Sequence, residues 1–164
     1  MLFRSLFDLN GAATSVTFSA SGSGGGGAWN NPSNTGDFAL LLNDSDAIGV
    51  NFQYTIAGLA HGTYLVYTYA VRPNGLHSDV DVTIAGSVAP ETRHLSGVMP
   101  GDQFILGTTH TIHQVSVADG ILRIQAVAPQ NNQLNGFQIV AVPEPLSLTT
   151  VIFGAVLFGA RRRR

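Results

Sequence analysis

Apolar residues alternate with polar ones at several places in the middle of the chain. Between Val50 and Ile56 every second residue is apolar, and residues 79–84 repeat the pattern with Val80, Val82 and Ile84. Successive side chains of a β-strand point to opposite faces, so a period of two predicts strands with one buried face. No stretch of residues 8–141 has the pattern of a long helix. We therefore expect an all-β domain.

Turn-forming residues divide the strand patterns. Gly58 to Gly62 are expected to reverse the chain, and residues 63–71, which are rich in Tyr, Val, Leu and Thr on both faces, are expected to form a central strand. Residues 134–141 are expected to form the last strand. We place Phe137 and Ile139 on one of its faces and Gln138 on the other.

The sequence around Asp119-Gly120 has the pattern of a β-hairpin. Val115 and Val117 precede this turn, and Leu122 and Ile124 follow it. A tight turn between two alternating runs is a short-range hairpin signal. We expect the two strands to pair, with Arg123 and Gln125 facing outward.

Further short strands are expected at residues 14–19, 38–42 and 103–106. About eight short strands with turns between them predict an antiparallel two-sheet β-sandwich. We assign residues 1–141 to this domain. Because Met1 to Phe7 include neither the apolar stretch nor the cleavage site of a signal peptide, we expect that the natural start is missing.

The composition is that of an exported domain. The chain has no cysteine, so the fold has no disulfides and rests on its core. Before Pro143 the chain has four basic residues and nine acidic ones. They are Arg4, Arg72, Arg93 and Arg123 against Asp8, Asp37, Asp44, Asp46, Asp79, Asp81, Glu91, Asp102 and Asp119. An acidic domain is a poor partner for nucleic acid.

The C-terminal part of the chain has a different pattern. An apolar run, residues 146–160, lies between a Pro-Glu-Pro tripeptide and a basic cluster. The tripeptide is Pro143, Glu144 and Pro145, and the cluster is Arg161, Arg162, Arg163 and Arg164. This order predicts a transmembrane helix whose arginines stay on the cytoplasmic side. The run spans about 22 Å as a helix against a hydrocarbon core of about 30 Å, and arginine snorkelling covers part of the difference. A buried core helix is the alternative.

Residues 142–164 resemble the PEP-CTERM sorting signal of Gram-negative bacteria that make exopolysaccharide. The resemblance implies recognition by an exosortase-type membrane transpeptidase at the bacterial membrane, with cleavage near Pro143 to Pro145. It implies localisation to the outer surface or the extracellular matrix, with at least transient membrane anchoring. A plain C-terminal anchor is the alternative interpretation.

Three segments, residues 58–64, 67–70 and 134–140, look like the jelly-roll ectodomains found ahead of this sorting signal. Those domains are similar in outline to galactose-binding-like and carbohydrate-binding modules, so the resemblance implies a jelly roll and a polysaccharide ligand. The other interpretation of these residues is structural. In it Gly62 serves the turn, and Tyr64 and Phe137 serve the core.

Sugar binding needs an exposed aromatic ring flanked by groups that bond hydroxyls. Trp29, the single tryptophan, lies beside Asn30 and Asn31 and is the first candidate. Tyr67 and Tyr69 are further candidates if their face of the sheet is open. Alternatively, Trp29 plugs the open end of the sandwich, since large aromatic side chains gain most from burial.

A calcium site is the single cofactor that the sequence suggests. Asn43, Asp44 and Asp46 bring oxygen ligands together in a predicted loop. The spacing does not continue as an EF-hand, and a solvated acidic turn is the alternative.

No catalytic motif is found, and we expect no enzyme activity. His110 and His113 are three residues apart in a predicted strand, so their side chains face opposite ways. The remaining histidines, His61, His77 and His94, are expected in or near solvated loops. A glycan-active enzyme would need two carboxylates from distant strands, such as Asp44 with Asp79 or Asp81, to meet in one cleft. A structural surface protein without a small ligand is the third hypothesis.

Overall fold

The computed structural model describes residues 4–7, 12–22, 26–28, 35–42, 44–48, 52–72, 75–128 and 132–143. Its elements, in chain order, are β1 (Arg4–Phe7), β2 (Ala13–Ser21), β3 (Gly26–Ala28), α1 (Gly36–Leu42), β4 (Asp44–Ile48), β5 (Phe52–Ala57), β6 (Gly62–Tyr69), β7 (Ser78–Ala85), β8 (Glu91–Gly97), β9 (His110–Val117), β10 (Ile121–Val127), β11 (Asn132–Leu134) and β12 (Gly136–Val142).

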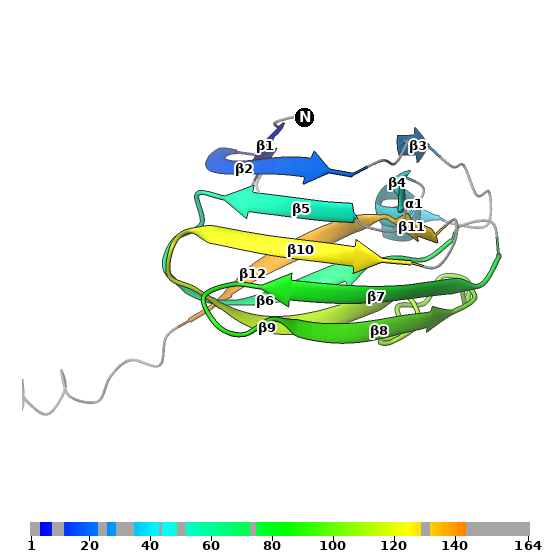
Figure 1. The fold of residues 1–164 in the computed structure, drawn as a ribbon. Coiled ribbons are helices and arrows are strands. Elements are labelled where there is room, and N and C mark those ends of the chain that lie inside the picture. The colour runs from blue at the N-terminus through cyan, green and yellow to red at the C-terminus, as the bar shows by residue number, and fades with distance from the viewer. Residues whose placement is uncertain are drawn as a thin grey trace, which may run out of the picture.

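Two antiparallel sheets form a sandwich-like, all-β fold, as predicted (Figure 1). The larger sheet has the order β1-β2-β5-β10-β7-β8, and the smaller one, behind it in the figure, has the order β12-β6-β9. A third group of short strands, β11-β4-β3, lies at one end beside α1. The predicted central strand is β6, which pairs with β12 on one side and β9 on the other.

The inner faces of the two sheets form the core. In β5, Phe52, Tyr54 and Ile56 are buried while Gln53 is exposed, which confirms the alternation seen in the sequence. Strands β7 and β10 behave in the same way. Among the fully buried aliphatic side chains of this core are Ile56, Val66, Val80, Val82, Ile84, Leu95, Leu122 and Ile124. Burial of this apolar surface is the main force that holds the sheets together.

The predicted hairpin at Asp119-Gly120 is wrong. Strand β9 pairs with β6 in the smaller sheet, whereas β10 pairs with β5 and β7 in the larger one. The turn therefore carries the chain from one sheet to the other. Strands β9 and β10 both bury their apolar side chains in the same core. Two strands in opposite sheets can do this as well as two strands of one hairpin.

The crossing from β5 to β6 lies beside the crossing from β9 to β10. The backbone N–H groups of Gly58 and Leu59 donate to the carbonyl oxygen of Gly120, at 3.0 and 3.2 Å. Gly58 has a φ of 88°, and a Cβ there would lie 2.9 Å from the carbonyl oxygen of Ser15. A glycine is therefore required. The antiparallel pairs β5–β10 and β6–β9 thus bend together across both sheets, a jelly-roll-like arrangement.

Two of the shorter predicted strands are also wrong. Residues 38–42 belong to helix α1, whose Ala and Leu residues are good helix formers. Residues 103–106 lie in the long connection between β8 and β9, where Leu106 forms an isolated bridge with His110. The third, residues 14–19, lies within β2, as predicted.

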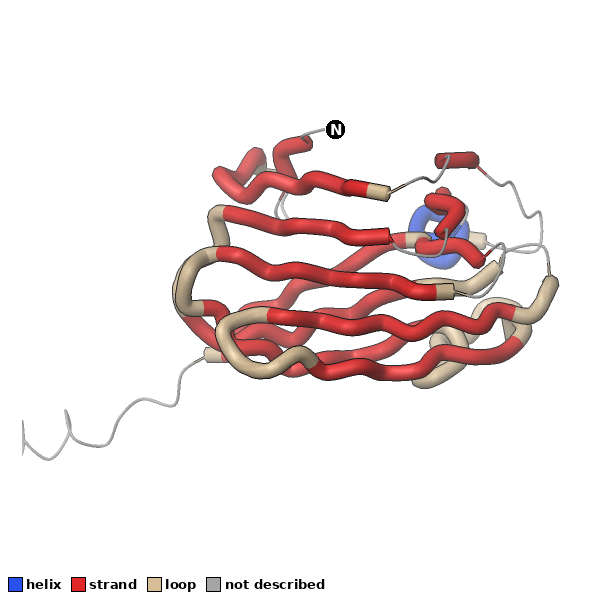
Figure 2. Tube along the Cα trace, in the orientation of Figure 1, coloured by secondary structure: helices blue, strands red, loops and turns tan. Residues whose placement is uncertain are grey.

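Helix α1 and the β8–β9 connection cover one end of the smaller sheet on its outer side. Leu42, Tyr69 and Val71 form a second hydrophobic cluster there, and partly buried side chains pack against it. These are Phe38, Leu41, Tyr67 and Met99. Strand β12 ends at the opposite end of the sandwich (Figure 2).

The predicted transmembrane helix, residues 146–160, lies outside the described residues. In the part of the chain that the structure describes, no helix has the length and hydropathy needed to span a membrane.

Candidate functional site

Tyr67 and Tyr69 both point away from the core, onto the outer face of the smaller sheet. Tyr64, Val66 and Thr68, which alternate with them, are buried between the sheets. Tyr69 is only 5% exposed because α1 and the β8–β9 connection cover it, whereas Tyr67 is half-buried. Of the two predicted tyrosines, Tyr69 is therefore covered by α1 and the β8–β9 connection, and Tyr67 is accessible.

The register of the sheet brings polar and aromatic side chains beside these tyrosines. Tyr67 is paired with Gln138 of β12 and Ile112 of β9. Tyr69 is paired with Gly136 and His110. Directly paired residues of adjacent strands point to the same side of a sheet, so Gln138 and His110 share the outer face with the tyrosines.

Four aromatic rings gather on this face. The ring of Tyr69 is 5.5 Å from those of His110 and Phe104, and Tyr67 stacks on His110 at 6.3 Å. Phe104 comes from the β8–β9 connection and is 45% exposed. Aromatic pairs at these separations attract one another beyond their buried area. We call Tyr67, Tyr69, Phe104, His110 and Gln138 the aromatic face.

A hydrogen bond orients the amide of this face. The hydroxyl of Tyr69 donates to Oε1 of Gln138 at 2.9 Å. Gly136 is paired directly with Tyr69 and has no side chain, which leaves room for the diagonal contact between Tyr69 and Gln138. A Cβ at Gly136 would lie 3.3 Å from Cδ1 of Leu41 in α1. Burial, with a smaller effect of Tyr67, raises the pKa of Tyr69, which therefore remains a donor at neutral pH.

Thr109 holds the imidazole of His110. Its hydroxyl oxygen lies 3.1 Å from Nδ1 of His110 and also bonds the backbone of Ile105. His110 is 9% exposed, and burial lowers its pKa. The imidazole is therefore neutral at pH 7.

His113 points into the core, opposite to His110, as its spacing predicted. It is fully buried between the two sheets. Burial lowers the pKa of His113, and the nearby charge of Arg93 lowers it further.

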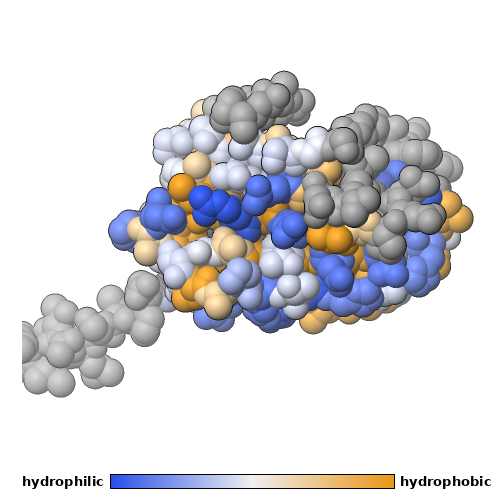
Figure 3. All heavy atoms as spheres, in the orientation of Figure 1, coloured by the Kyte–Doolittle hydropathy of each residue, from blue (hydrophilic) through white to orange (hydrophobic). Residues whose placement is uncertain are grey.

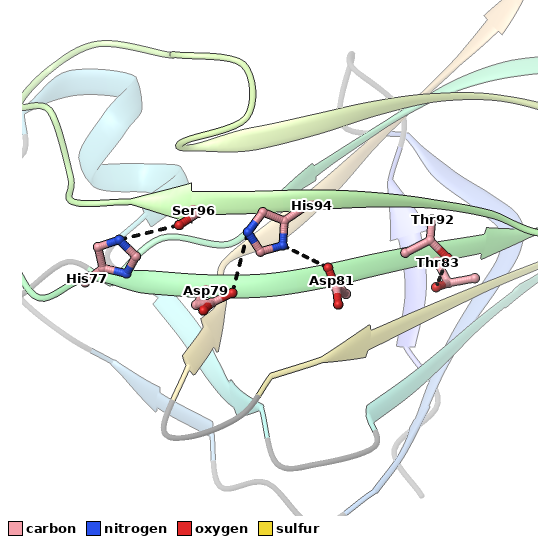
Figure 4. A network of polar contacts seen from close by, with 7 residues as sticks. All are labelled: His77, Asp79, Asp81, Thr83, Thr92, His94 and Ser96. Carbon is pink, nitrogen blue, oxygen red and sulfur yellow. Dashed lines mark hydrogen bonds and ion pairs between the residues drawn. The ribbon is translucent and has the colours of Figure 1, made fainter.

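The outer face of the larger sheet has a different chemistry (Figure 4). Nδ1 of His94 lies 2.9 Å from Asp81, and its Nε2 lies 3.6 Å from Asp79. His94 is in strand β8 and not in or near a loop, which corrects the sequence interpretation. The same face carries the Thr83–Thr92 contact at 2.7 Å and the Ser96–His77 contact at 3.4 Å. We call these seven residues the polar face.

The other predicted site residues lie outside the described residues, in strand β4 or directly after β12. Trp29, Asn30, Asn31 and Asn43 lie outside the described residues, as do Glu144, Pro145 and Arg161 to Arg164. Asp44 and Asp46 lie in strand β4 and not in a loop, because β4 pairs with β3 and β11. Within the described ranges, no group of three His, Cys, Asp or Glu residues has the geometry to hold a metal. Pro143 is exposed, directly after β12.

Sequence reasoning missed three residues of the aromatic face: Phe104, His110 and Gln138. The sequence pattern predicts a strand at Phe104 and no site at His110. The alternation of inward and outward positions is the available signal, because it places His110 and Gln138 on the outer side of their strands. The β6–β9 pairing that brings His110 to Tyr69 is not visible in the sequence.

No family model matches this chain, and the search of curated proteins finds no relative. One solved structure that it resembles is described as TmCBM61 in complex with beta-1,4-galactotriose. The two share 11% sequence identity, with a TM-score of 0.45 over 76% of this chain and 88% of that chain. At this distance the likeness carries no argument about a site or a ligand.

Proposed function

We propose that this protein is an exported surface protein whose β-sandwich domain binds polysaccharide through the aromatic face. The observation that carries the proposal is the position of Tyr67. Its ring is accessible on the outer face of a sheet, and the exposed amide of Gln138 lies directly opposite on β12. A flat apolar surface next to groups that both donate and accept hydrogen bonds is what a sugar requires.

A second amide lies near the first. Gln114 of β9 is exposed and is paired with Leu65, which is two residues before Tyr67 on the same outer face. A sugar chain that crosses Tyr67 would therefore meet an amide on each side. The apolar faces of the sugar rings would pack on Tyr67, and their hydroxyls would bond the two amides.

The C-terminal segment carries the sorting half of the proposal. Its support is the Pro-Glu-Pro tripeptide, the apolar run and the arginine cluster. The position of Pro143 is compatible with it, because the chain leaves β12 at the end of the sandwich away from α1 and Tyr69. A domain tethered through this segment would present the aromatic face at the far end from the membrane.

A binding screen tests the polysaccharide proposal. The full-length chain, kept soluble in mild detergent, is tested against a panel of polysaccharides with and without calcium. We expect Tyr67→Ala to weaken binding at least about tenfold, since a central aromatic anchor dominates such contacts. Thr83→Ala on the polar face is the matched control. Trp29→Ala tests the alternative platform that the sequence suggests.

Equal binding by the wild type and Tyr67→Ala would remove the aromatic face from the proposal. A loss in Trp29→Ala alone would move the site to the Trp29 segment. Deletion of residues 143–164 tests sorting, and we expect the deleted protein to lose membrane association.

A structural role without a ligand is the second candidate. It is favoured by the low exposure of Tyr69 and His110, at 5% and 9%, which suits packing better than binding. Absence of binding to every polysaccharide in the panel would support this candidate.

A further inference from the structure

The outward positions of the smaller sheet carry no charged side chain. Strand β6 pairs with β12 on one side and β9 on the other, and directly paired residues point to the same side of a sheet. The outward positions therefore form four rows across the three strands, and none of them is Asp, Glu, Lys or Arg. From the end that α1 covers, the rows are Gly136 with Tyr69 and His110, Gln138 with Tyr67 and Ile112, Val140 with Leu65 and Gln114, and Val142 with Thr63 and Ser116.

The two middle rows place their apolar side chains along a diagonal of the sheet. One row contributes Tyr67 and Ile112, and the next contributes Leu65 and Val140. We call these four residues the apolar band. Val140 is 48% exposed, and the other three are partly exposed. The two ends of the band, Ile112 and Val140, are two strands and two residues apart, about 12 Å. A ligand that covers the band therefore spans more than one sugar ring.

An exposed amide lies on each side of the apolar band. Gln138 is beside Tyr67 on β12, and Gln114 is beside Leu65 on β9. Amides both donate and accept hydrogen bonds, so these two positions suit sugar hydroxyls. The band itself does not suit them, because three of its four side chains are aliphatic. A hydroxyl placed over an aliphatic side chain loses its water and gains no hydrogen bond.

Apolar groups on the ligand would suit these aliphatic positions. A methyl or acetyl group that lies on Leu65, Ile112 or Val140 removes apolar surface from water on both partners. An unsubstituted sugar chain has few such groups to offer. The aliphatic part of the band therefore favours a polysaccharide whose hydroxyls are partly replaced by apolar substituents.

The charge of the domain opposes an acidic polymer. Nine acidic residues and four basic ones precede Pro143. At the covered end of the face, the β8–β9 connection adds Asp102, which is exposed and accepts a hydrogen bond from Thr35. An anionic polysaccharide would meet repulsion from the domain as a whole and no cation at the outward positions of the sheet.

We propose that the ligand of the aromatic face is an uncharged polysaccharide that carries O-acetyl or methyl groups. A sugar ring packs on Tyr67, and the apolar substituents lie on Leu65, Ile112 and Val140. This inference rests on the proposed function and adds to it the feature by which the protein distinguishes its ligand from an unsubstituted chain.

The experiment compares three forms of the same polymer. Galactan, glucomannan and xylan are each prepared with O-acetyl groups, after alkaline removal of these groups, and with methyl ethers in their place. Polygalacturonate is the anionic polymer. The full-length protein is reconstituted in lipid nanodiscs, so that no free detergent competes for the apolar band. Calorimetry measures the dissociation constants, and thermal unfolding verifies that each variant is folded.

We expect the substituted forms of a neutral polymer to bind at least about tenfold more tightly than the unsubstituted form, since each buried methyl group contributes about fourfold. This comparison uses the wild type, so a variant that fails to fold does not prevent the test. Tyr67→Ala should weaken the binding of all three forms.

A substitution in the apolar band should change the preference itself. Val140→Thr keeps the β-branched shape and replaces a methyl group by a hydroxyl. It should reduce the ratio between the substituted and unsubstituted forms about fourfold. Val88→Thr is the matched control, because Val88 is 57% exposed and lies between β7 and β8 of the larger sheet. This control should leave the ratio unchanged.

Two results would overturn the inference and leave the proposed function intact. One is equal binding of all three forms while Tyr67→Ala still abolishes binding, and the other is polygalacturonate binding as tight as that of the neutral polymers. A dimer in sedimentation that Val140→Asp dissociates would also overturn the inference, because a second copy would then cover the band. Absence of binding by the wild type to every polymer would overturn both the inference and the proposed function.

Discussion

The two outer faces of the sandwich are built on the same alternation but present opposite chemistries. On the larger sheet, most residues that alternate with core positions in the middle of β5, β10 and β7 are polar, as Gln53, Gln125 and Asp81 are, and blue and pale atoms outnumber orange ones over these strands (Figure 3). On the smaller sheet, the outward positions of β6 are Leu65, Tyr67 and Tyr69. Helix α1 and the β8–β9 connection cover the end of this sheet that carries Tyr69.

The two faces differ in how much their side chains contribute to the stability of the domain and to the proposed binding. His94, Asp79 and Asp81 are each at least half exposed, and ion pairs in such positions contribute little to stability. The aromatic face combines a buried half, which stabilises the domain, with an accessible half around Tyr67. Substitutions on the aromatic face should therefore lower the stability more than substitutions on the polar face do. On the aromatic face, substitutions of buried residues should affect stability, and substitutions around Tyr67 should affect binding.

The largest effect is expected for Tyr69→Ala. The substitution removes a 95% buried ring that packs on Leu42 and Val71, and large-to-small changes of this kind lower the free energy of unfolding by about 3–5 kcal/mol. Urea denaturation measures the change. Thr83→Ala on the polar face should stay within about 0.5 kcal/mol of the wild type. Similar losses in both variants would show that the two faces do not differ.

A pH effect on stability is expected from the smaller sheet through His113. The folded-state pKa of His113 is below its unfolded value of about 6.5, so the unfolded state binds more protons between these two values. Stability should be greatest above pH 6.5 and should fall as the pH drops toward the folded-state pKa.

Denaturation at pH 7.5 and pH 5.5 tests this effect. His113→Leu should reduce the loss of stability, although His110 still contributes in the same direction. Thr83→Ala on the polar face, which removes a group that does not titrate, should leave the loss unchanged. The prediction fails if His113→Leu keeps the full pH dependence of the wild type.

A smaller effect is expected for Tyr69→Phe. It removes the hydrogen bond to Gln138 and keeps the packed ring, which should lower the free energy of unfolding by about 1 kcal/mol. A double-mutant cycle with Gln138→Leu measures the coupling between the two side chains. Additive losses would mean that the bond has no energetic role.

The smallest effect is expected for His94→Ala. Its contacts with Asp79 and Asp81 join exposed groups, so we expect a change within about 0.5 kcal/mol at neutral pH. Thermal unfolding measures it. A loss comparable with that of Tyr69→Phe would show that the polar face also stabilises the sheet.

Local patterns predicted the strands with clear alternation. Strands β5, β7 and β10 bury the residues that their period of two predicts, and Phe137 and Gln138 lie on opposite faces of β12. The error at Asp119-Gly120 has a physical cause. A turn and two alternating runs describe a hairpin within one sheet and a crossing between two sheets equally well, and the difference lies in which distant strands pair.

The candidate site was predictable only in part. Tyr67 and Tyr69 were found because aromatic residues on a strand are conspicuous, but the sequence did not show that α1 would cover one and leave the other accessible. The sequence places His94 in or near a loop because its short run of polar neighbours has the composition of one. In the structure it pairs with Asp81 of β7, beside the buried Leu95.

By itself, the sequence determined the all-β class and the inward and outward sides of the main strands, and the assignment of residues 142–164 to a sorting segment stays a prediction. These properties depend on neighbouring residues, whose periodicity and turn chemistry are local. Only the tertiary structure decided that β9 and β10 lie in opposite sheets, and that His110, Gln138 and Phe104 meet at Tyr69. These contacts depend on strand pairing and packing between segments that are distant in the sequence. Several arrangements share the same local pattern, and the burial of a common core selects one of them.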